Sequence, residues 1–186
     1  MIITIPNPIL TTPAGHVKVI DKKVRQVVEK LKRALINTNN PRGVGLAAPQ
    51  IGIPLQIFIT RPTEKSAIEV FVNPEIIWQS DKLAEISRPD SQKASVKKDK
   101  KLEGCLSIAN IWGHLKRPEK VKLRYMDLSG KIQEKEFYGF MATIIQHETD
   151  HLNGILFTQR VLEQKEKLYR IEKNEKGEEK MVEIEI

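Results

Sequence analysis

The sequence predicts a single α+β domain in which antiparallel or mixed sheets surround a central helix, with a further helix near the N-terminus. Three observations predict this fold class. The chain has 186 residues, a length that suits one domain with a substantial core. Two segments carry apolar residues at helical spacing, and the segments between them show strand patterns. The order of strands followed by a central helix is typical of α+β domains, and no internal repeat divides the chain.

The N-terminal part is predicted to hold an extended segment followed by a helix. Residues 2–10 contain early prolines, which favour an extended backbone at the domain surface. Asp21 can cap a helix. The apolar stripe that follows it consists of Val24, Val27, Val28, Leu31 and Leu35. The helix should end at residues 37–40, because Pro41 disfavours a helical residue before it.

The middle of the chain is predicted to form strands and a hairpin. Residues 55–60, 70–73 and 76–78 are short apolar runs typical of buried strands. Residues 120–126 alternate apolar and polar side chains, and the turn sequence Asp-Leu-Ser-Gly-Lys leads from them to residues 133–137. This pattern predicts a hairpin with one buried face.

The central helix is predicted at residues 140–153, and Gly154 suits the left-handed position that closes a helix. Two further segments are rich in charge. Residues 79–102 hold a cluster of lysines and are predicted to be a long, mobile surface insertion. Residues 163–186 place Lys-Asn-Glu-Lys-Gly-Glu-Glu between two apolar runs, and this charged tail is predicted to be a hairpin.

The composition indicates a reducing compartment and no membrane span. Cys105 is the only cysteine, so no disulfide can form within the chain. No window approaches the roughly 18 apolar residues of a membrane span, and the N-terminal residues resemble no targeting peptide. We therefore expect a cytoplasmic protein without membrane contact. The net charge of +7 suits an anionic neighbour such as RNA, but few aromatic residues accompany the basic ones, so no specific nucleic-acid binding is predicted.

The predicted central helix carries a pattern typical of metal sites, Gln-His-Glu-Thr-Asp-His-Leu-Asn-Gly at residues 146–154. His147 and His151 lie one turn apart on the same helix face, where two imidazoles can bind one ion. Glu148 lies beside that face, close enough to act on a water without being a ligand. The alternative is a polar helix face with ordinary histidines. Asp150 has no role that follows from the sequence, except as a neighbour that could contact His151.

A catalytic metal site needs a third protein ligand, and the residues leave two choices open. Glu-Gly-Cys-Leu-Ser at residues 103–107 contains the only cysteine, and a thiolate is a strong ligand for soft metals. A glutamate downstream of His151 would instead match a common kind of zinc endopeptidase. His16 and His114 have no partner at ligand spacing and are expected at the surface or the core edge.

Residues 43–50, Gly-Val-Gly-Leu-Ala-Ala-Pro-Gln, form a glycine-rich loop without the spacing of a phosphate-binding motif. Its small residues would let the backbone approach a ligand, and the amide of Gln50 can donate a hydrogen bond to an oxygen. A tight turn before the next strand is the alternative interpretation.

These three motifs, in this order, resemble the signature motifs of the peptide deformylases, and the resemblance extends over residues 5–157. It implies a metal-dependent hydrolase that removes the N-formyl group from the N-terminal formyl-methionine of newly synthesised polypeptides and releases formate. The expected partners are N-formyl-methionyl nascent peptides, and we expect a monomer. Bacterial relatives that dock on the ribosome use a long C-terminal helix, which residues 163–186 do not predict, so ribosome association stays open.

The resemblance also assigns roles to individual residues. The metal ligands that it implies are Cys105, His147 and His151. Glu148 would be the general acid and base, while the Gln50 side-chain amide and the Leu106 backbone N–H would form the oxyanion hole. The family's metal in cells is typically Fe(II), with Ni, Co or Zn as substitutes. The donor types by themselves suit zinc equally well.

A substrate pocket can be inferred on the same helix face. The side chains expected to line a pocket for the methionine are Phe140, Thr143, Ile144 and Val44. The three helix residues lie one or two turns before His147, on or near its face. Alternatively, Phe140 and Ile144 are core residues without a role in a pocket. The backbone groups expected to pair with an extended peptide, as an added strand, are those of Val44, Gly45 and Gly104.

Two positions depart from the family pattern. Ala109 stands where many relatives have a proline, and Trp112 stands near where many have an arginine. These departures concern the loop that would meet the substrate and leave the chemical residues intact. Two other functions compete with deformylation. One is a zinc peptidase with a downstream glutamate ligand, and the other is a non-catalytic homologue that binds chain ends at the ribosome.

Overall fold

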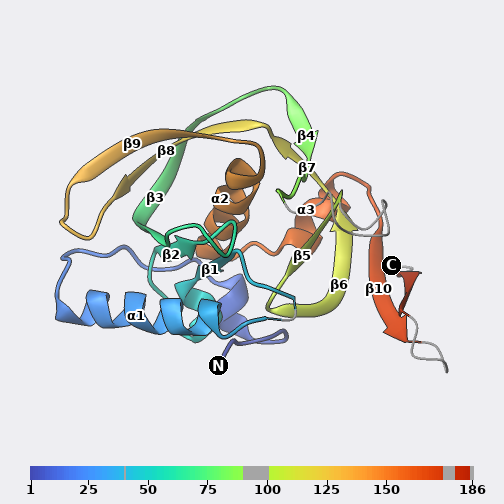
Figure 1. Cartoon of the computed structure of the whole chain (residues 1–186), viewed down its shortest axis with the longest axis horizontal. Helices are drawn as coiled ribbons and strands as arrows, with labels where there is room; N and C mark the ends of the chain where they lie inside the picture. Colours follow the sequence, from blue (N-terminus) through green and yellow to red (C-terminus); the bar gives the residue numbers. More distant parts are fainter. Residues whose placement is uncertain (40, 90–100, 174–178, 185–186) are drawn as a thin grey trace.

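The structure, a computed structural model, describes residues 1–39, 41–89, 101–173 and 179–184. It is a single α+β domain with antiparallel sheets, which confirms the predicted fold class. The α-helices of the described residues are α1 (Lys22–Ile36), α2 (Gly139–Leu152) and α3 (Phe157–Glu163). Figure 1 shows α2 in the middle of the molecule, with strands around it and α1 along one side.

α1 begins and ends where the sequence predicts. The Asp21 carboxylate accepts a hydrogen bond from the Val24 N–H at 2.9 Å and so caps the helix. The whole predicted apolar stripe is buried in one core cluster. The segment before the helix is expected to be extended, but it includes a short 3-10 helix, η1 (Pro8–Thr11), where the Asn7 side chain accepts a bond from the Ile9 N–H.

The larger sheet has five antiparallel strands in the order β1-β2-β3-β8-β9. Its strands are β1 (Gly45–Ala47), β2 (Ile57–Thr60), β3 (Glu69–Gln79), β8 (Lys120–Met126) and β9 (Ile132–Tyr138). The predicted hairpin is confirmed as β8 with β9. Its turn is held by Asp127, whose carboxylate accepts hydrogen bonds from the backbone N–H groups of Ser129 and Lys131 at 2.8 and 3.1 Å.

Residues 70–73 and 76–78, predicted as separate strands, belong to one strand, β3, so this prediction is wrong. Pro74 suggests a break, but it lies where the register of the β3–β8 pairing shifts. Asn73 takes a φ of 49° there, and its side chain bonds the backbone N–H and C=O of Val17 at 2.8 Å each. Such a bulge tolerates proline, because the residue needs no ladder hydrogen bond.

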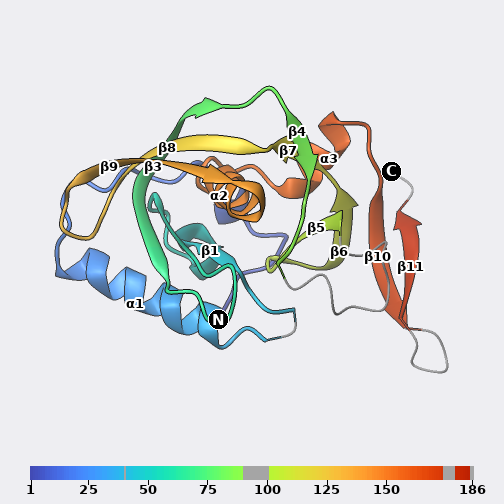
Figure 2. The same ribbon diagram turned by 45° about the horizontal axis from the view of Figure 1, so that its top comes forward.

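A second sheet has four strands in the order β11-β10-β6-β5, and a small third sheet pairs β4 with β7. These strands are β4 (Leu83–Glu85), β5 (Leu102–Cys105), β6 (Ile108–His114), β7 (Lys116–Pro118), β10 (Leu168–Lys173) and β11 (Glu179–Ile184). Figure 2 shows β10 and β11 at one side of the molecule, next to β6. β10 pairs antiparallel with β11, which confirms the hairpin predicted for the tail, and β10 also pairs with β6, so this hairpin is part of the second sheet.

The segment 79–102, expected to be a mobile surface insertion, is built into the fold at both ends. β4 pairs with β7, and Ile86 is 7% exposed in a cluster with Phe140. Leu102 is buried at the start of β5. The prediction is therefore wrong for these ends, because apolar side chains anchor them in the core. The lysine-rich residues 90–100 lie outside the described part of the chain.

α2 occupies the centre of the domain, as predicted. Ten of its fourteen residues are buried, and several of these are polar or charged. The helix is closed at Gly154, which has a φ of 70°, and a Cβ atom there would lie 2.7 Å from the backbone carbon of Thr11. Of the helices that the structure describes, none is both long and apolar enough to cross a membrane.

Candidate active site

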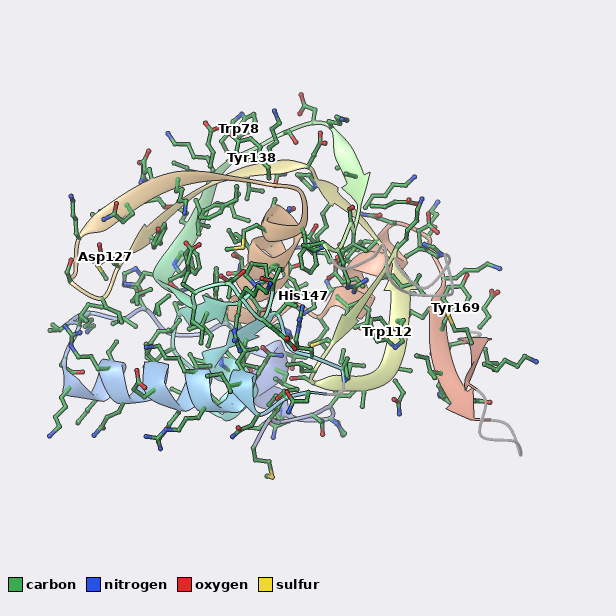
Figure 3. All side chains as sticks on the ribbon, in the orientation of Figure 1. Trp78, Trp112, Asp127, Tyr138, His147 and Tyr169 are labelled. Carbon is green, nitrogen blue, oxygen red and sulfur yellow. The ribbon has the colours of Figure 1, made fainter. Side chains whose placement is uncertain are left out.

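α2 and β5 bring three donors of the kind that bind metals close together. His147 and His151 project from α2 with ring centroids 4.9 Å apart. Cys105, the last residue of β5, places its Sγ atom 3.1 Å from Nε2 of His151. The ligand atoms of the three residues all lie within 4.8 Å of one another. Figure 3 shows His147 near the middle of the molecule.

This arrangement favours Cys105 among the third ligands that the sequence leaves open. Among the described residues, Cys105 with the two helix histidines is the only group of three such donors that could hold an ion. Glu163, a downstream glutamate, is instead engaged by Gln159 and Arg160. His16 is exposed, and His114 is half-buried with its ring against Tyr169, so both lie where they were expected.

The electrostatics of the cluster favour a thiolate at Cys105. Burial by itself raises the pKa of this thiol, but the charges and hydrogen bonds of His151 and His147 outweigh burial and lower the pKa to about 5. The thiolate is the form of cysteine that binds metals. The donor set of one thiolate and two imidazoles therefore fits a divalent transition metal.

Glu148 is a buried carboxyl group beside the cluster. It is 4% exposed, and burial raises its pKa to about 7. Its Oε2 atom has no hydrogen-bond partner among the described residues, although the side chain lines a cavity. A buried polar atom without a partner is rare in folded proteins and is a common feature of catalytic groups.

Gly45 in the glycine-rich loop permits this placement of Glu148. A Cβ atom on Gly45 would collide with the Glu148 carboxylate and lie 2.9 Å from Cγ2 of Ile144. The absence of a side chain at this position therefore lets β1 lie directly against α2. The loop backbone is expected to approach a ligand, and within the protein it lies against the Glu148 side chain.

Gln50 links the glycine-rich loop to the cysteine motif. Its Oε1 atom accepts a hydrogen bond from the Ala47 N–H at 2.8 Å, and this bond fixes the orientation of the amide. Its Nε2 atom donates to Oγ of Ser107 at 3.1 Å and lies 3.6 Å from Sγ of Cys105. Leu106 occupies the turn between β5 and β6, beside these atoms in sequence. The sequence offered no role for Ser107, although it stands in the cysteine motif.

A cavity of about 630 Å³ opens over this cluster. The predicted site residues that line it are Val44, Gly45, Gln50, Gly104, Cys105, Leu106, Phe140, Thr143, Ile144, His147 and Glu148. His151 lies beneath the cavity wall and is 1% exposed. The three motifs, which are far apart in the sequence, thus meet at one concave site.

The predicted pocket residues on α2 serve two purposes at once. Phe140 and Ile144 are 8% and 3% exposed and pack with Ile86 in a core cluster that Val44 contacts. Both also line the cavity. Thr143 is half-buried, and its hydroxyl donates to the Gly139 carbonyl at 3.4 Å. The cavity therefore has an apolar wall with one polar group.

A buried network of charged side chains contacts His147 of the cluster. The sequence did not predict this network. Oε1 of Glu103 lies 2.6 Å from Nδ1 of His147. Arg117 donates two hydrogen bonds to Glu103, at 2.9 and 2.8 Å, and a third to Asp150 at 2.9 Å. Asp150 also accepts bonds from Arg160, so its partners are arginines and the expectation of a contact with His151 has no support. The sequence held one sign of this network, because Glu103 is a charged residue two positions before Cys105.

The fold and the site together define a class of protein. A Cys-His-His cluster, a buried carboxyl group without a partner and a cavity bordered by glycine backbone are the parts of a metal-dependent hydrolase.

Comparisons with known proteins identify the family within this class. The family model described as polypeptide deformylase matches residues 1–167, so the chain belongs to the peptide deformylase family. Enzymes of this family remove the N-formyl group from nascent polypeptides, and they depend on a metal.

Individual relatives agree with this assignment. A peptide deformylase of Mesorhizobium japonicum is 35% identical over 163 residues, which cover 86% of this chain and 82% of the relative. Peptide deformylase 1 of Bacillus subtilis is 35% identical over 160 residues, with 86% and 88% covered. The structure of a peptide deformylase from Synechococcus elongatus in complex with actinonin matches with a TM-score of 0.73 and 32% identity, over 87% of this chain and 78% of that one. A Met-Ala-Ser-bound deformylase structure from Acinetobacter baumannii matches with a TM-score of 0.72 and 31% identity, over 87% and 97%.

Proposed function

We propose that this chain removes the formyl group from the N-terminal formyl-methionine of new polypeptides by general acid and base catalysis at Glu148. The observation that carries this proposal is the buried Glu148 carboxyl group, which has an Oε2 atom without a partner in the described chain and borders the cavity over the Cys-His-His cluster. The relative with bound Met-Ala-Ser supports the choice of substrate, because that tripeptide begins with an unformylated methionine.

Cys105, His147 and His151 would hold the metal. When bound there, a divalent ion supplies Lewis-acid chemistry, which lowers the pKa of water and polarises the formyl oxygen. The resemblance to the family favours Fe(II) in cells, with Zn, Ni or Co in a purified protein. The donors support any of these ions, since imidazole and thiolate ligands suit all of them.

Glu148 takes the proton of the attacking water and later returns a proton to the departing amine. The pKa of about 7 supports both steps, because a group with this pKa is populated in both protonation states near neutral pH. The carboxyl group is buried, and Gly45 leaves room for it because this residue has no Cβ atom.

Gln50 and Leu106 stabilise the negative charge that develops on the formyl oxygen. The Gln50 Nε2 group and the Leu106 backbone N–H are the proposed donors. The Ala47 N–H bond that orients the Gln50 amide supports this role, because an oxyanion donor must be fixed before the reaction.

The methionine side chain enters the apolar wall of the cavity. Phe140, Ile144 and Val44 provide that wall, and Thr143 adds a hydroxyl. The backbones of Val44, Gly45 and Gly104 pair with the peptide as an added strand. Such a strand needs free space beside β1 and β5, and the cavity borders both.

The proposed setting follows from the substrate. Nascent chains emerge in the cytoplasm, so we place the protein there, as a monomer that acts on peptides at or near the ribosome. The net charge of +7 supports an encounter with an anionic assembly of this kind.

A formate-release assay tests the proposal. The metal-loaded protein should release formate from formyl-Met-Ala-Ser and leave the matched acetyl-Met-Ala-Ser intact. Cleavage of an internal bond in an unmodified peptide would favour a zinc peptidase instead. Tight binding of formyl-Met-Ala-Ser without formate release would favour a non-catalytic homologue.

A further inference from the structure

One face of the second sheet carries a row of side chains that leads away from the metal cluster. Gly104 in β5 is paired with Trp112 in β6, and Trp112 is paired with Tyr169 in β10. Cross-strand partners lie on the same face of a sheet, and so does Ile171, two residues after Tyr169. Figure 3 shows Trp112 between His147 and Tyr169, so the row runs from the cluster toward the tail.

The end of this row is contributed by a segment outside the family match. The polypeptide deformylase model matches residues 1–167, and β10 begins at the next residue, Leu168. Nevertheless, Ile171 lines the same cavity as Cys105 and Glu148. The pairing of β10 with β6 brings the tail to this position. The tail therefore extends the cavity wall beyond the part that the family model covers.

Trp112 is held as a fixed apolar surface in this wall. A Cβ atom on Gly104 would lie 2.7 Å from the Trp112 ring, so the ring packs directly on the Gly104 backbone. The Arg88 guanidinium lies 5.8 Å from the ring centroid and donates to the Leu102 carbonyl at 2.8 Å. Contacts of this kind restrict the ring, and a restricted aromatic side chain costs little entropy when a ligand binds.

We propose that Trp112 and Ile171 form a subsite that selects apolar side chains at the positions after the methionine. This inference rests on the proposed function. A peptide that pairs with the Gly104 backbone, with its formyl end at Cys105 and its methionine against α2, extends its next residues along the opposite wall of the cavity. That wall holds an indole ring and an isoleucine, which favour contact with apolar groups over neutral polar ones. It also holds the Arg88 guanidinium beside the ring, so an uncharged polar residue is the proper comparison for an apolar one.

The test compares formate release from four peptides, formyl-Met-Leu-Ser, formyl-Met-Asn-Ser, formyl-Met-Ala-Leu and formyl-Met-Ala-Asn. For the wild-type protein, kcat/KM should favour leucine over asparagine by about tenfold or more at one of the two positions. Ile171→Ser should reduce this ratio to below about threefold, because the apolar contact is lost. A loss of folded protein would lower both rates equally and leave the ratio unchanged.

Met181 provides the matched control. It lies in β11 directly opposite Ile171, in the same pair of strands, but it does not line the cavity. Met181→Ser should keep the wild-type ratio. A wild-type ratio near one at both positions, or an unchanged ratio in Ile171→Ser, would overturn the proposal.

The outcome can be separated from a failure of the proposed function. If the wild-type protein releases no formate from formyl-Met-Ala-Ser, deformylation itself is wrong. Calorimetric titration of the unformylated peptides Met-Leu-Leu and Met-Asn-Asn then tests the subsite alone. Tighter binding of the leucine peptide by the wild type, and its loss in Ile171→Ser, would support the subsite, whereas equal binding would contradict it.

Discussion

Oε1 of Glu103 lies 2.6 Å from Nδ1 of His147, and the two side chains are 4% and 11% exposed. Burial by itself raises the pKa of Glu103, but the charge and hydrogen bonds of Arg117 outweigh it, so Glu103 stays ionised. An ionised acceptor at Nδ1 holds the proton on that nitrogen and leaves Nε2 of His147 free to bind a metal. Glu103 is therefore a positioning residue for His147.

Replacement of Glu103 should weaken metal binding. In Glu103→Gln the charge at Nδ1 of His147 is lost, and we expect the affinity for Zn²⁺ to fall by about 10- to 100-fold. Competition with a chromogenic chelator measures this change. Glu134→Gln is the control, because Glu134 forms exposed ion pairs on β9 and should leave the affinity unchanged. Equal affinities in wild type and Glu103→Gln would refute the positioning role.

Loss of Arg117 should destabilise the fold. Arg117→Met leaves Glu103 and Asp150 buried without their cation, which we expect to cost about 3–5 kcal/mol of unfolding free energy. Urea denaturation measures the change. Arg124→Met removes an arginine whose side chain is 48% exposed, and this control should cost at most about 1 kcal/mol. Similar losses in the two variants would contradict the importance of the buried network.

Glu148 should be essential for turnover and dispensable for metal binding. Glu148→Ala removes the proposed acid and base, so we expect kcat for formate release to fall by about 10²- to 10⁴-fold. The metal content of the purified variant should equal that of the wild type, because the metal cluster consists of other residues. A metal-replete Glu148→Ala protein with wild-type kcat would rule out the assignment.

A methyl group at Gly45 should displace the catalytic carboxyl group. The added Cβ would lie 2.9 Å from Cδ of Glu148, so Gly45→Ala should reduce kcat by about 10²-fold through misplacement of Glu148. The control is Gly15→Ala, where the nearest atom to an added Cβ is the Pro54 carbonyl oxygen at an ordinary 3.4 Å. This control should retain full activity. Wild-type turnover in Gly45→Ala would show that Glu148 can move without loss.

Asp127 should make stability depend on pH in the acid range. Hydrogen bonds from the side chains of Ser129 and Gln133, and then from backbone N–H groups, lower its pKa from 3.8 to about 2. A lowered carboxyl pKa adds stability that is fully present above the unfolded-state pKa and is lost as the pH falls toward the folded-state value. The urea midpoint of Asp127→Asn should therefore lie below that of the wild type at pH 5–7, and the gap should narrow between pH 4 and pH 2. A gap of constant size would contradict this account.

The sequence by itself determined the local elements and the chemistry of the site. The helix after Asp21 and the hairpin of β8 with β9 follow from caps, apolar spacing and turn residues, all of which act between near neighbours. The two histidines of α2 are likewise a local pattern, because a helix places residues four apart on one face. No local pattern connects Cys105 with these histidines, and the resemblance to a family was needed to choose it as the third ligand.

Only the tertiary structure decided which distant residues meet. Glu103, Arg117 and Asp150 are separated by 14 and 33 residues in the chain, yet their side chains bond in the interior. Nothing in their local sequence predicts this, since charged residues usually lie at the surface and burial becomes favourable only when all three are paired.

The same reason applies to the continuous strand β3 and to the tail. Pro74 does not break β3, because the Asn73 side chain bonds the backbone of Val17, which lies 56 residues away in the chain. The tail forms the predicted hairpin, but its place beside the cavity depended on the edge of β6 with which β10 pairs. Pairing between distant segments depends on the whole packed domain, so it was decided by the tertiary structure and not by the local sequence.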